Sequence, residues 1–423
     1  MQPDWLQRMP IGQWFRISGD RPGLGLAPTP PGTRYLQDND PAADPELNPA
    51  RSARERLRRW LGRRPSSPWQ GRSGFPSITE AWNGAVLATR FGKSGAMVVF
   101  GGGHNDYFGA DLHAFDLGTR QWSRIADGYI SHDPNAYGKG AVYPHGEYPD
   151  GSPLPPHTYE YVQYDPEGND YILFKGQLEL GPDVKAVAIA HMFNFDTMLW
   201  RRSPRHSQAV LNSGGCTVWD AKRRVVWGNS GDAGGGNAFL CFDPQCANAD
   251  GTFGSWGEMF ANKLAGEADH NAMAMDPARD IIVVTAHARN ALCAIDPSHP
   301  GQPLEQLRSS ANQPHLQEYA ALEYAPNLHA FVYFSARPGA VAYRITPPDG
   351  ASWNELTAGE WRWETLHDEN NDLDPVTDAG RESAHEVSIT HTFGRFRVAT
   401  YGGVDVALLV RHIDSPVYAM RLT

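Results

Sequence analysis

Histidine and tyrosine residues stand beside glycine-rich and proline-rich turns at several places in this sequence. His104 lies in the run GGGHND, and His157 and Tyr159 lie in the run PHTY. Imidazole exchanges protons near neutral pH and can act as a general base, while a tyrosine hydroxyl can protonate a departing oxygen. A guanidinium can bind a carboxylate through two parallel hydrogen bonds. These residue types suit β-elimination on a uronic acid, in which a base removes the proton at C5 and the carboxylate takes up enolate charge.

The sequence offers more than one residue for most of these roles. The expected catalytic residues are His104, His157, Tyr159, Arg289 and Arg337. The two histidines are alternatives for the base, and the two arginines are alternatives for binding the carboxylate. Tyr159 or Tyr319 is the expected acid. The residues expected to bind the substrate are Trp82, Asn83, Asn105, Asp106, Lys175, His270, Asn271, His287, Tyr319, His385 and Tyr401.

Six segments of the chain share one plan, which predicts the elements that hold these residues. Each has an apolar run, a short polar turn and a second β-rich run that ends in glycine or another small residue. The turns, such as DPEGND and DPARD, carry the residues typical of β-hairpins. The six segments cover residues 85–103, 161–176, 217–231, 271–286, 320–335 and 388–403.

A third and a fourth strand often follow the hairpin. The third ends in an aromatic or apolar residue and an aspartate, as in LHAFD and FLCFD, and the fourth begins at a tryptophan. Units of four strands at a period near 50 residues are the signature of β-propeller blades. We therefore predict an all-β protein with a single β-propeller over residues 82–423. Six four-stranded blades are expected, with seven as the alternative if residues 19–81 contain another.

The N-terminal segment is expected to complete the last blade. The final unit shows only three strands and ends in VYAMRLT, whereas GQWFRIS (12–18) matches the outer strand QWSRI (121–125). A strand from residues 1–18 would close the ring and leave no free edge. Residues 19–81 then form a Pro/Arg-rich insertion, with a short basic helix expected over residues 51–64.

The strand plan also predicts where the polar residues meet. The innermost strand of a propeller blade comes first. The residues before it share one face, near the axis, with the loop after the second strand, and the hairpin turn between the two strands lies on the opposite face. Tyr401 is assigned to the axial face because FRVATY fits a second strand. Convergence of titratable groups on one concave face is typical of an active site. Five histidines occupy axial positions: His104, His157, His270, His287 and His385.

One segment resembles a known repeat. Residues 100–125 read FGGGHNDYFGADLHAFDLGTRQWSRI, with a glycine pair, an Asp-Leu strand, an aromatic-Asp pair and then a tryptophan. This resembles a kelch repeat. Together with WNGA (82–85), YPDG (148–151) and PHTY (156–159), it resembles uncharacterised bacterial and phage kelch-like proteins and, distantly, propeller-type polysaccharide lyases. The resemblance implies a carbohydrate-active propeller that uses His, Tyr and Arg in a central cleft and acts on an acidic polysaccharide or oligosaccharide.

Other functions fit the same residues. A non-catalytic glycan- or protein-binding kelch module needs only exposed aromatic side chains on the axial face. A sugar epimerase is a third hypothesis, as is a glycoside hydrolase, which needs two carboxylates about 5–9 Å apart. The elimination requires no cofactor. Axial His, Asp and Asn side chains could still hold a divalent metal such as Ca²⁺, Mn²⁺ or Zn²⁺, although no HExxH or tight HxH spacing is present.

Composition and charge narrow the expected partners. The chain carries 37 Lys and Arg against 48 Asp and Glu, a net charge of −11, which argues against a nucleic-acid partner. No run approaches about 18 apolar residues, so we expect no membrane span, and we expect a monomer. MQPDWLQRMP has no apolar signal region, so the sequence leaves the localisation open, with a cytoplasmic or phage-associated protein as the expectation unless the N-terminus is incomplete. The four cysteines, Cys216, Cys241, Cys246 and Cys293, are expected to be buried free thiols. A disulfide between Cys241 and Cys246 is the alternative.

Overall fold

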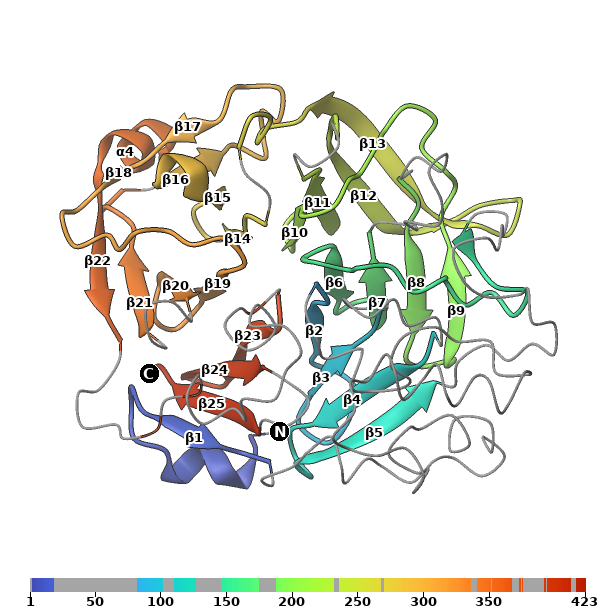
Figure 1. Cartoon of the computed structure of the whole chain (residues 1–423), viewed down its shortest axis with the longest axis horizontal. Coiled ribbons are helices and arrows are strands. Elements are labelled where there is room, and N and C mark those ends of the chain that lie inside the picture. The colour runs from blue at the N-terminus through green and yellow to red at the C-terminus, as the bar shows by residue number, and fades with distance from the viewer. Residues whose placement is uncertain are drawn as a thin grey trace, which may run out of the picture.

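The described residues of the computed structural model form six β-sheets around a central axis (Figure 1). Four strands of each sheet pair antiparallel with their neighbours, and in blades 1 to 4 the strand that comes first in the chain lies innermost. The chain is therefore an all-β six-bladed propeller, as the repeats predict. The structure describes residues 2–18, 82–101, 110–126, 146–174, 188–231, 236–267, 270–335, 341–350, 352–366, 373, 375, 392, 394–411 and 416–423.

Blades 1 to 3 each contain four strands in chain order, and the first two strands of each are one of the predicted hairpins. Blade 1 consists of β2 (Ala85–Ala88), β3 (Ala96–Val99), β4 (Leu112–Asp116) and β5 (Gln121–Ala126). Blade 2 consists of β6 (Val162–Asp165), β7 (Asp170–Leu173), β8 (His191–Asn194) and β9 (Leu199–Arg202). Blade 3 consists of β10 (Cys216–Asp220), β11 (Val225–Asn229), β12 (Ala238–Ala247) and β13 (Phe253–Ala261).

Blades 4 and 5 follow the same plan, and blade 5 carries an additional strand, β18, that pairs in parallel with β22. Blade 4 consists of β14 (Met273–Asp276), β15 (Ile281–Ala286), β16 (Ala291–Ile295) and β17 (Glu305–Gln306). Blade 5 consists of β18 (Arg308–Ser309), β19 (Ala321–Ala325), β20 (Ala330–Ser335), β21 (Val341–Thr346) and β22 (Glu360–Thr365). Short helices are η1 (Asp4–Arg8), η4 (His287–Arg289) and α4 (Trp353–Ala358).

Blade 6 joins the two ends of the chain. It consists of β23 (Phe396–Tyr401), β24 (Val404–Val410), β25 (Val417–Arg421) and β1 (Trp14–Arg16). In Figure 1 the N-terminal β1 lies beside the C-terminal β25, and the two pair antiparallel with Trp14 opposite Met420. The indole of Trp14 is buried and lies 5.4 Å from the ring of Phe334 in blade 5. The predicted closure by an N-terminal strand is therefore confirmed.

Both faces of an inner strand are buried because each blade packs against two neighbours. Along β20, Phe331 and Tyr333 belong to the apolar cluster shared with blade 4, whereas Val332 and Phe334 belong to the cluster shared with blade 6. This alternation has the period of two that a β-strand imposes on its side chains. It explains why the inner strands are apolar at almost every position.

Aspartates at the ends of first strands hold the hairpin turns on the face opposite to the predicted site. Asp220 Oδ1 accepts hydrogen bonds of 3.0 Å from the backbone N–H groups of Lys222 and Arg223. Asp276 caps its own turn in the same way. These contacts pair N–H groups that a tight turn leaves without backbone acceptors. The turn residues of this face are therefore explained by structure alone.

The predicted strand assignment in blade 6 is wrong by one strand. FRVATY is the innermost strand, β23, and it pairs with β24 through a turn at Gly402 and Gly403. Tyr401 therefore lies at the hairpin turn on the opposite face and not among the axial residues. Its hydroxyl donates a 2.7 Å hydrogen bond to the carbonyl of Ser94, in the corresponding turn of blade 1. Tyr401 thus joins blades 6 and 1. The prediction that it binds the substrate on the axial face is therefore wrong.

Replacing Tyr401 with Phe tests this placement. The substitution removes one hydrogen bond between blades and keeps the ring, so the free energy of unfolding should fall by about 1 kcal/mol. Urea unfolding measures this change. Ligand binding on the axial face should stay as in the wild type, and a loss of binding at unchanged stability would contradict the placement.

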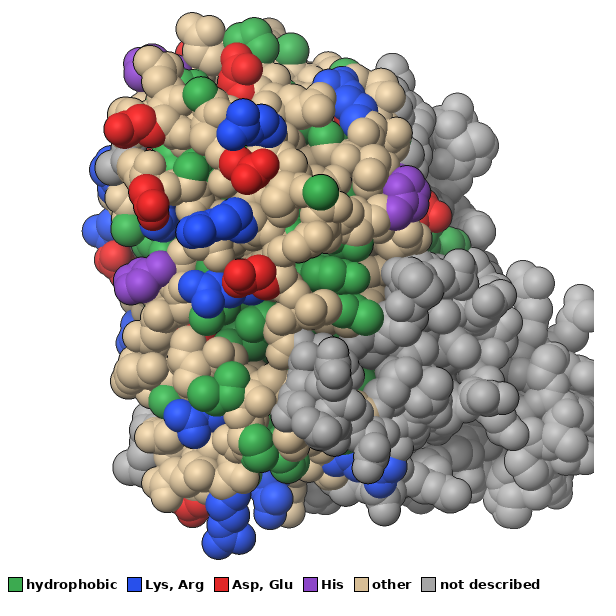
Figure 2. Space-filling model, turned by 90° about the vertical axis from the view of Figure 1, so that its left-hand side faces the viewer, with side chains coloured by type: hydrophobic (Ala, Val, Ile, Leu, Met, Phe, Trp, Pro, Cys, Tyr) green, Lys and Arg blue, Asp and Glu red, His purple; other side chains and the backbone are tan. Residues whose placement is uncertain are grey.

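The rim at the left of Figure 1 carries acidic and basic side chains interspersed with one another (Figure 2). A surface of mixed sign does not focus an electrostatic field on a charged ligand. This rim therefore gives no electrostatic reason to place a ligand there.

The structure tests some of the remaining predictions, on the insertion, the cysteines and a membrane span, and leaves others untested. The insertion at residues 19–81, with its expected basic helix, lies outside the described residues. All four cysteines are free thiols: Cys216 and Cys293 are buried as expected, Cys241 is half-buried, and Cys246 is exposed against expectation. None of the helices that the structure describes is long and apolar enough to cross a membrane.

Candidate functional site

Five blades reach the axis through a residue with left-handed backbone. We call the residues directly before the innermost strand of a blade its lead-in. Bulky residues rarely adopt this conformation, which costs about 1–3 kcal/mol each. Because strained backbone tends to occur at functional sites, four aromatic residues in this conformation indicate a functional site. Blades 1 to 5 have, in order, Trp82 (φ 69°), Tyr159 (46°), Gly214 (74°), His270 (68°) and Tyr319 (58°).

Backbone hydrogen bonds join these lead-ins from blade to blade. The N–H of Tyr159 donates to the carbonyl of Trp82 over 2.7 Å. The N–H of His270 donates to Gly214 over 2.8 Å, and that of Tyr319 donates to His270 over 3.1 Å. Each lead-in is thus fixed by its neighbour, which stabilises the strained backbone and orients the side chain.

The aromatic side chains of the lead-ins form a row, which we call the aromatic row: Trp82, His157, Tyr159, His270 and Tyr319. The ring centroids of Trp82 and His157 are 4.8 Å apart, and those of His157 and Tyr159 are 6.0 Å apart. Tyr159 lies 5.0 Å from His270, which lies 3.9 Å from Tyr319. These are direct ring contacts. The structure therefore brings together residues from four blades that the strand plan assigned to one face.

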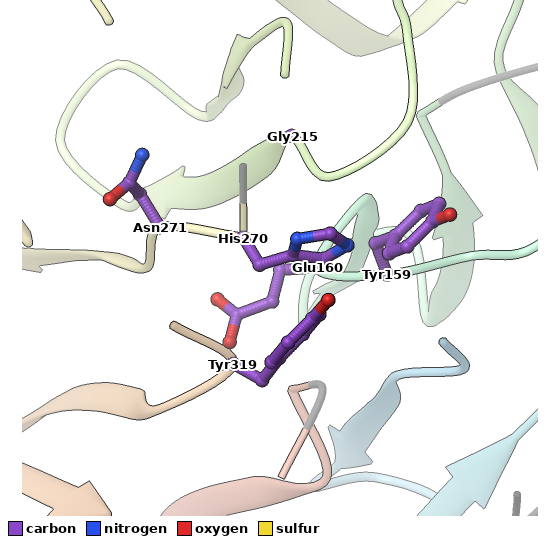
Figure 3. A pocket seen from close by; sticks show the side chains of 6 residues that line it. All are labelled: Tyr159, Glu160, Gly215, His270, Asn271 and Tyr319. Carbon is purple, nitrogen blue, oxygen red and sulfur yellow. The ribbon is translucent and has the colours of Figure 1, made fainter. Parts of the chain in front are cut away.

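A small cavity opens beside the row (Figure 3). Its volume is about 10 Å³, which is enough for about one water molecule. The Tyr319 hydroxyl points toward the His270 ring. A sugar ring is too large for this space, so a sugar would lie over the row and insert only one small group. The cavity is lined by Tyr159, Glu160, Gly215, His270, Asn271 and Tyr319.

Glu160 is the buried acid of this cavity, and the sequence analysis missed it. The residue is 8% exposed. Burial raises its pKa from 4.5 to about 8, Arg397 opposes that change, and Glu323 adds to it. Glu160 therefore carries a proton at pH 7. Its one sequence signal is its position directly after Tyr159, within an axial lead-in.

Arg397 occupies the axis between four blades. Its Nε donates to the carbonyl of Ala85 over 2.8 Å, and Nη2 donates to the carbonyl of Val162 over 3.4 Å. Its Nη1 is paired with the carboxylate of Glu323. Each guanidinium nitrogen thus has a protein partner, and burial still raises the pKa of Glu323. Arg397 is fixed by the fold and is not positioned to bind a substrate.

Two of the predicted binding residues hold the lead-ins in place. Asn83 is fully buried, and its Oδ1 accepts a 3.2 Å hydrogen bond from the backbone N–H of Thr158. His287 Nδ1 lies 2.9 Å from Asn271 Oδ1, and burial lowers the pKa of His287. Asn83 is therefore placed inside the protein, whereas His287 braces a residue that lines the cavity.

Arg289 lies in an ion pair with Glu267, which is 2% exposed, and it is not among the residues that line the cavity. Its charge is thus already balanced by a buried carboxylate. Within the described part of the chain, no three His, Cys, Asp or Glu side chains come together as metal ligands, so a divalent metal stays a prediction. Six predicted residues lie outside the described residues: His104, Asn105, Asp106, Lys175, Arg337 and His385.

Comparison with protein-family models and with the curated proteins finds no match. Among solved structures, a chain in the crystal structure of a nidogen/laminin complex is similar, with a TM-score of 0.37 and 12% identity. The similarity covers 68% of this chain and 80% of that chain. Similarity at this level carries no argument about function, and the six-bladed fold rests on the sheets of this chain itself.

Proposed function

We propose that the axial face of this propeller binds an acidic glycan and cleaves it by β-elimination. The contact between His270 and Tyr319 carries the proposal, because their ring centroids are 3.9 Å apart beside a cavity that they share. An imidazole next to a phenol supplies a base and an acid within reach of neighbouring atoms of one substrate. The rest of the aromatic row offers ring faces on which sugars can pack.

His270 is the base in this proposal, and Tyr319 is the acid. The base removes the proton at C5, the electron pair forms the C4–C5 double bond, and the bond from C4 to the glycosidic oxygen breaks as Tyr319 protonates that oxygen. A base and an acid that lie side by side serve best when the C5 proton and the glycosidic oxygen at C4 lie on the same side of the sugar ring. Glucuronate and mannuronate have that arrangement, whereas galacturonate and guluronate do not. His157, which the sequence analysis offered as a base, is the alternative, and its ring centroid lies 6.0 Å from that of Tyr159.

A glycan- or protein-binding module is the second candidate. The glycine-rich segment of blade 1 resembles a kelch repeat, and that resemblance carries no catalytic residue with it. The aromatic row also supports binding without chemistry, since the partly exposed rings of Trp82 and His157 extend it beyond the cavity. The two candidates differ in one observable, which is the formation of an unsaturated product.

Incubation with four polymers separates them. Glucuronan and polymannuronate should give an unsaturated product that absorbs in the ultraviolet, and pectate and polyguluronate should give less because their geometry requires groups on opposite sides of the ring. No absorbance with any of the four contradicts the elimination. Retention of a polymer on the immobilised protein would then support the binding module.

A further inference from the structure

We propose that Glu160 receives the carboxylate of a uronate residue as a neutral acid, so that the cavity selects acidic sugars without presenting a cation to them. The inference rests on the proposed function and names the group that recognises its substrate. It replaces the expectation that Arg289 or Arg337 binds this carboxylate.

The size of the cavity limits what can enter it. With room for about one water, it can take one oxygen atom of a carboxylate but not a sugar ring. Glu160 lines this space, is 8% exposed, and receives none of the described hydrogen bonds on its carboxyl group. A carboxylate oxygen in the cavity would therefore lie against a carboxyl group able to donate to it. Hydrogen bonds to ionised acceptors are about twice as strong as neutral ones.

Burial keeps Glu160 neutral, the charge of Glu323 adds to this effect, and the charge of Arg397 opposes it. Glu323 on β19 and Arg397 on β23 face it from the axis, and Cys216 on β10 faces it from blade 3. Arg397 is already bound to Glu323 and to two backbone carbonyls. None of the described residues that line the cavity is Lys or Arg. The other titratable side chains that line it are those of Tyr159, His270 and Tyr319.

This arrangement predicts that acidic ligands bind less tightly in alkaline solution. Burial raises the pKa of Glu160 to about 8. Above that pH the group loses the proton that it would donate and gains a charge that repels the ligand. The affinity for a uronate should therefore fall roughly 30-fold between pH 7 and pH 9.5, a range above that in which imidazole ordinarily titrates.

The experiment uses two ligands that differ only at C6, methyl β-D-glucuronide and methyl β-D-glucoside. Neither has a glycosidic bond at C4, so neither can be cleaved. Calorimetric titration of the wild-type protein should show the glucuronide binding at least about tenfold more tightly than the glucoside at pH 7 and losing this advantage by pH 9.5.

Two variants identify the responsible group. Glu160→Gln keeps the volume and supplies an amide N–H that donates at every pH. Its affinity for the glucuronide should stay within about threefold of the wild type at pH 7 and should not change up to pH 9.5. The matched control Glu318→Gln removes an exposed carboxylate next to Tyr319 and should keep the wild-type pH dependence. Circular dichroism confirms that both variants fold.

Each other outcome has a defined meaning. Equal affinity for the two glycosides, no binding of the glucuronide, or a wild-type affinity that does not change with pH overturns the role of Glu160. A Glu160→Gln variant that still binds less tightly at high pH also overturns it, because another group must then be titrating. If the wild type shows the expected pH dependence but forms no unsaturated product from any polymer, the elimination fails and the role of Glu160 stands.

Discussion

Replacing His270 with Gln is expected to lower kcat for the elimination by about 10²–10⁴-fold, the usual contribution of a positioned base or acid. Tyr319→Phe should have an effect of similar size, since it removes the hydroxyl and keeps the ring contact of 3.9 Å. KM should change by less than about threefold, because the aromatic row still binds the sugar. The double variant should be little slower than either single variant, since the two groups act as a unit. Initial rates of product absorbance measure all three.

His299→Gln is the matched control for this series. His299 is exposed, and its ring contacts Asp296 over 2.8 Å, outside the cavity. The His299→Gln variant should have the activity of the wild type. If either single variant at His270 or Tyr319 keeps a third or more of kcat, that residue has no catalytic role. A collapse of the rate with His157→Ala in its place would return the role of base to His157.

The blade pattern can be predicted from the sequence because each hairpin is local. Its strands are close along the chain, so alternating apolar residues and turn residues reveal the pair. Blade 6 differs, since β25 and β1 come from opposite ends of the sequence. SITHT, FRVATY and VDVALLV are all β-rich, and only pairing over long distances decides which of them is innermost. This is why Tyr401 was assigned to the wrong face.

The lead-in residues were predictable for a similar reason. A propeller fixes which strand ends meet at the axis, so Trp82 and Tyr319 could be assigned to one face although 237 positions separate their numbers in the chain. Glu160 was not predictable, because its pKa depends on burial that only the tertiary structure creates. The positive φ angles were not predictable either, since aromatic residues rarely adopt them.

Arg397→Met should lower the free energy of unfolding by about 3–5 kcal/mol, because it leaves the buried carboxylate of Glu323 without its cation. The substitution also removes the donors that bind the carbonyls of Ala85 and Val162, the first residues of β2 and β6. These inner strands belong to different blades, so the loss should affect the whole ring. The midpoint of urea unfolding, followed by tryptophan fluorescence, measures it.

Adding Glu323→Gln to Arg397→Met tests the cause. The double variant leaves no charged carboxylate at position 323, so about half or more of the lost free energy should return at pH 7. The pH dependence gives an independent check. Burial raises the pKa of Glu323, so the folded protein holds a proton that the unfolded chain releases, and stability falls as the pH rises through that range. Without Arg397 this fall is larger, so the single variant should lose more stability at pH 8 than at pH 5, and the double variant should show a smaller difference. A double variant no more stable than Arg397→Met would mean that the two backbone hydrogen bonds, and not the charge pair, hold the inner strands together.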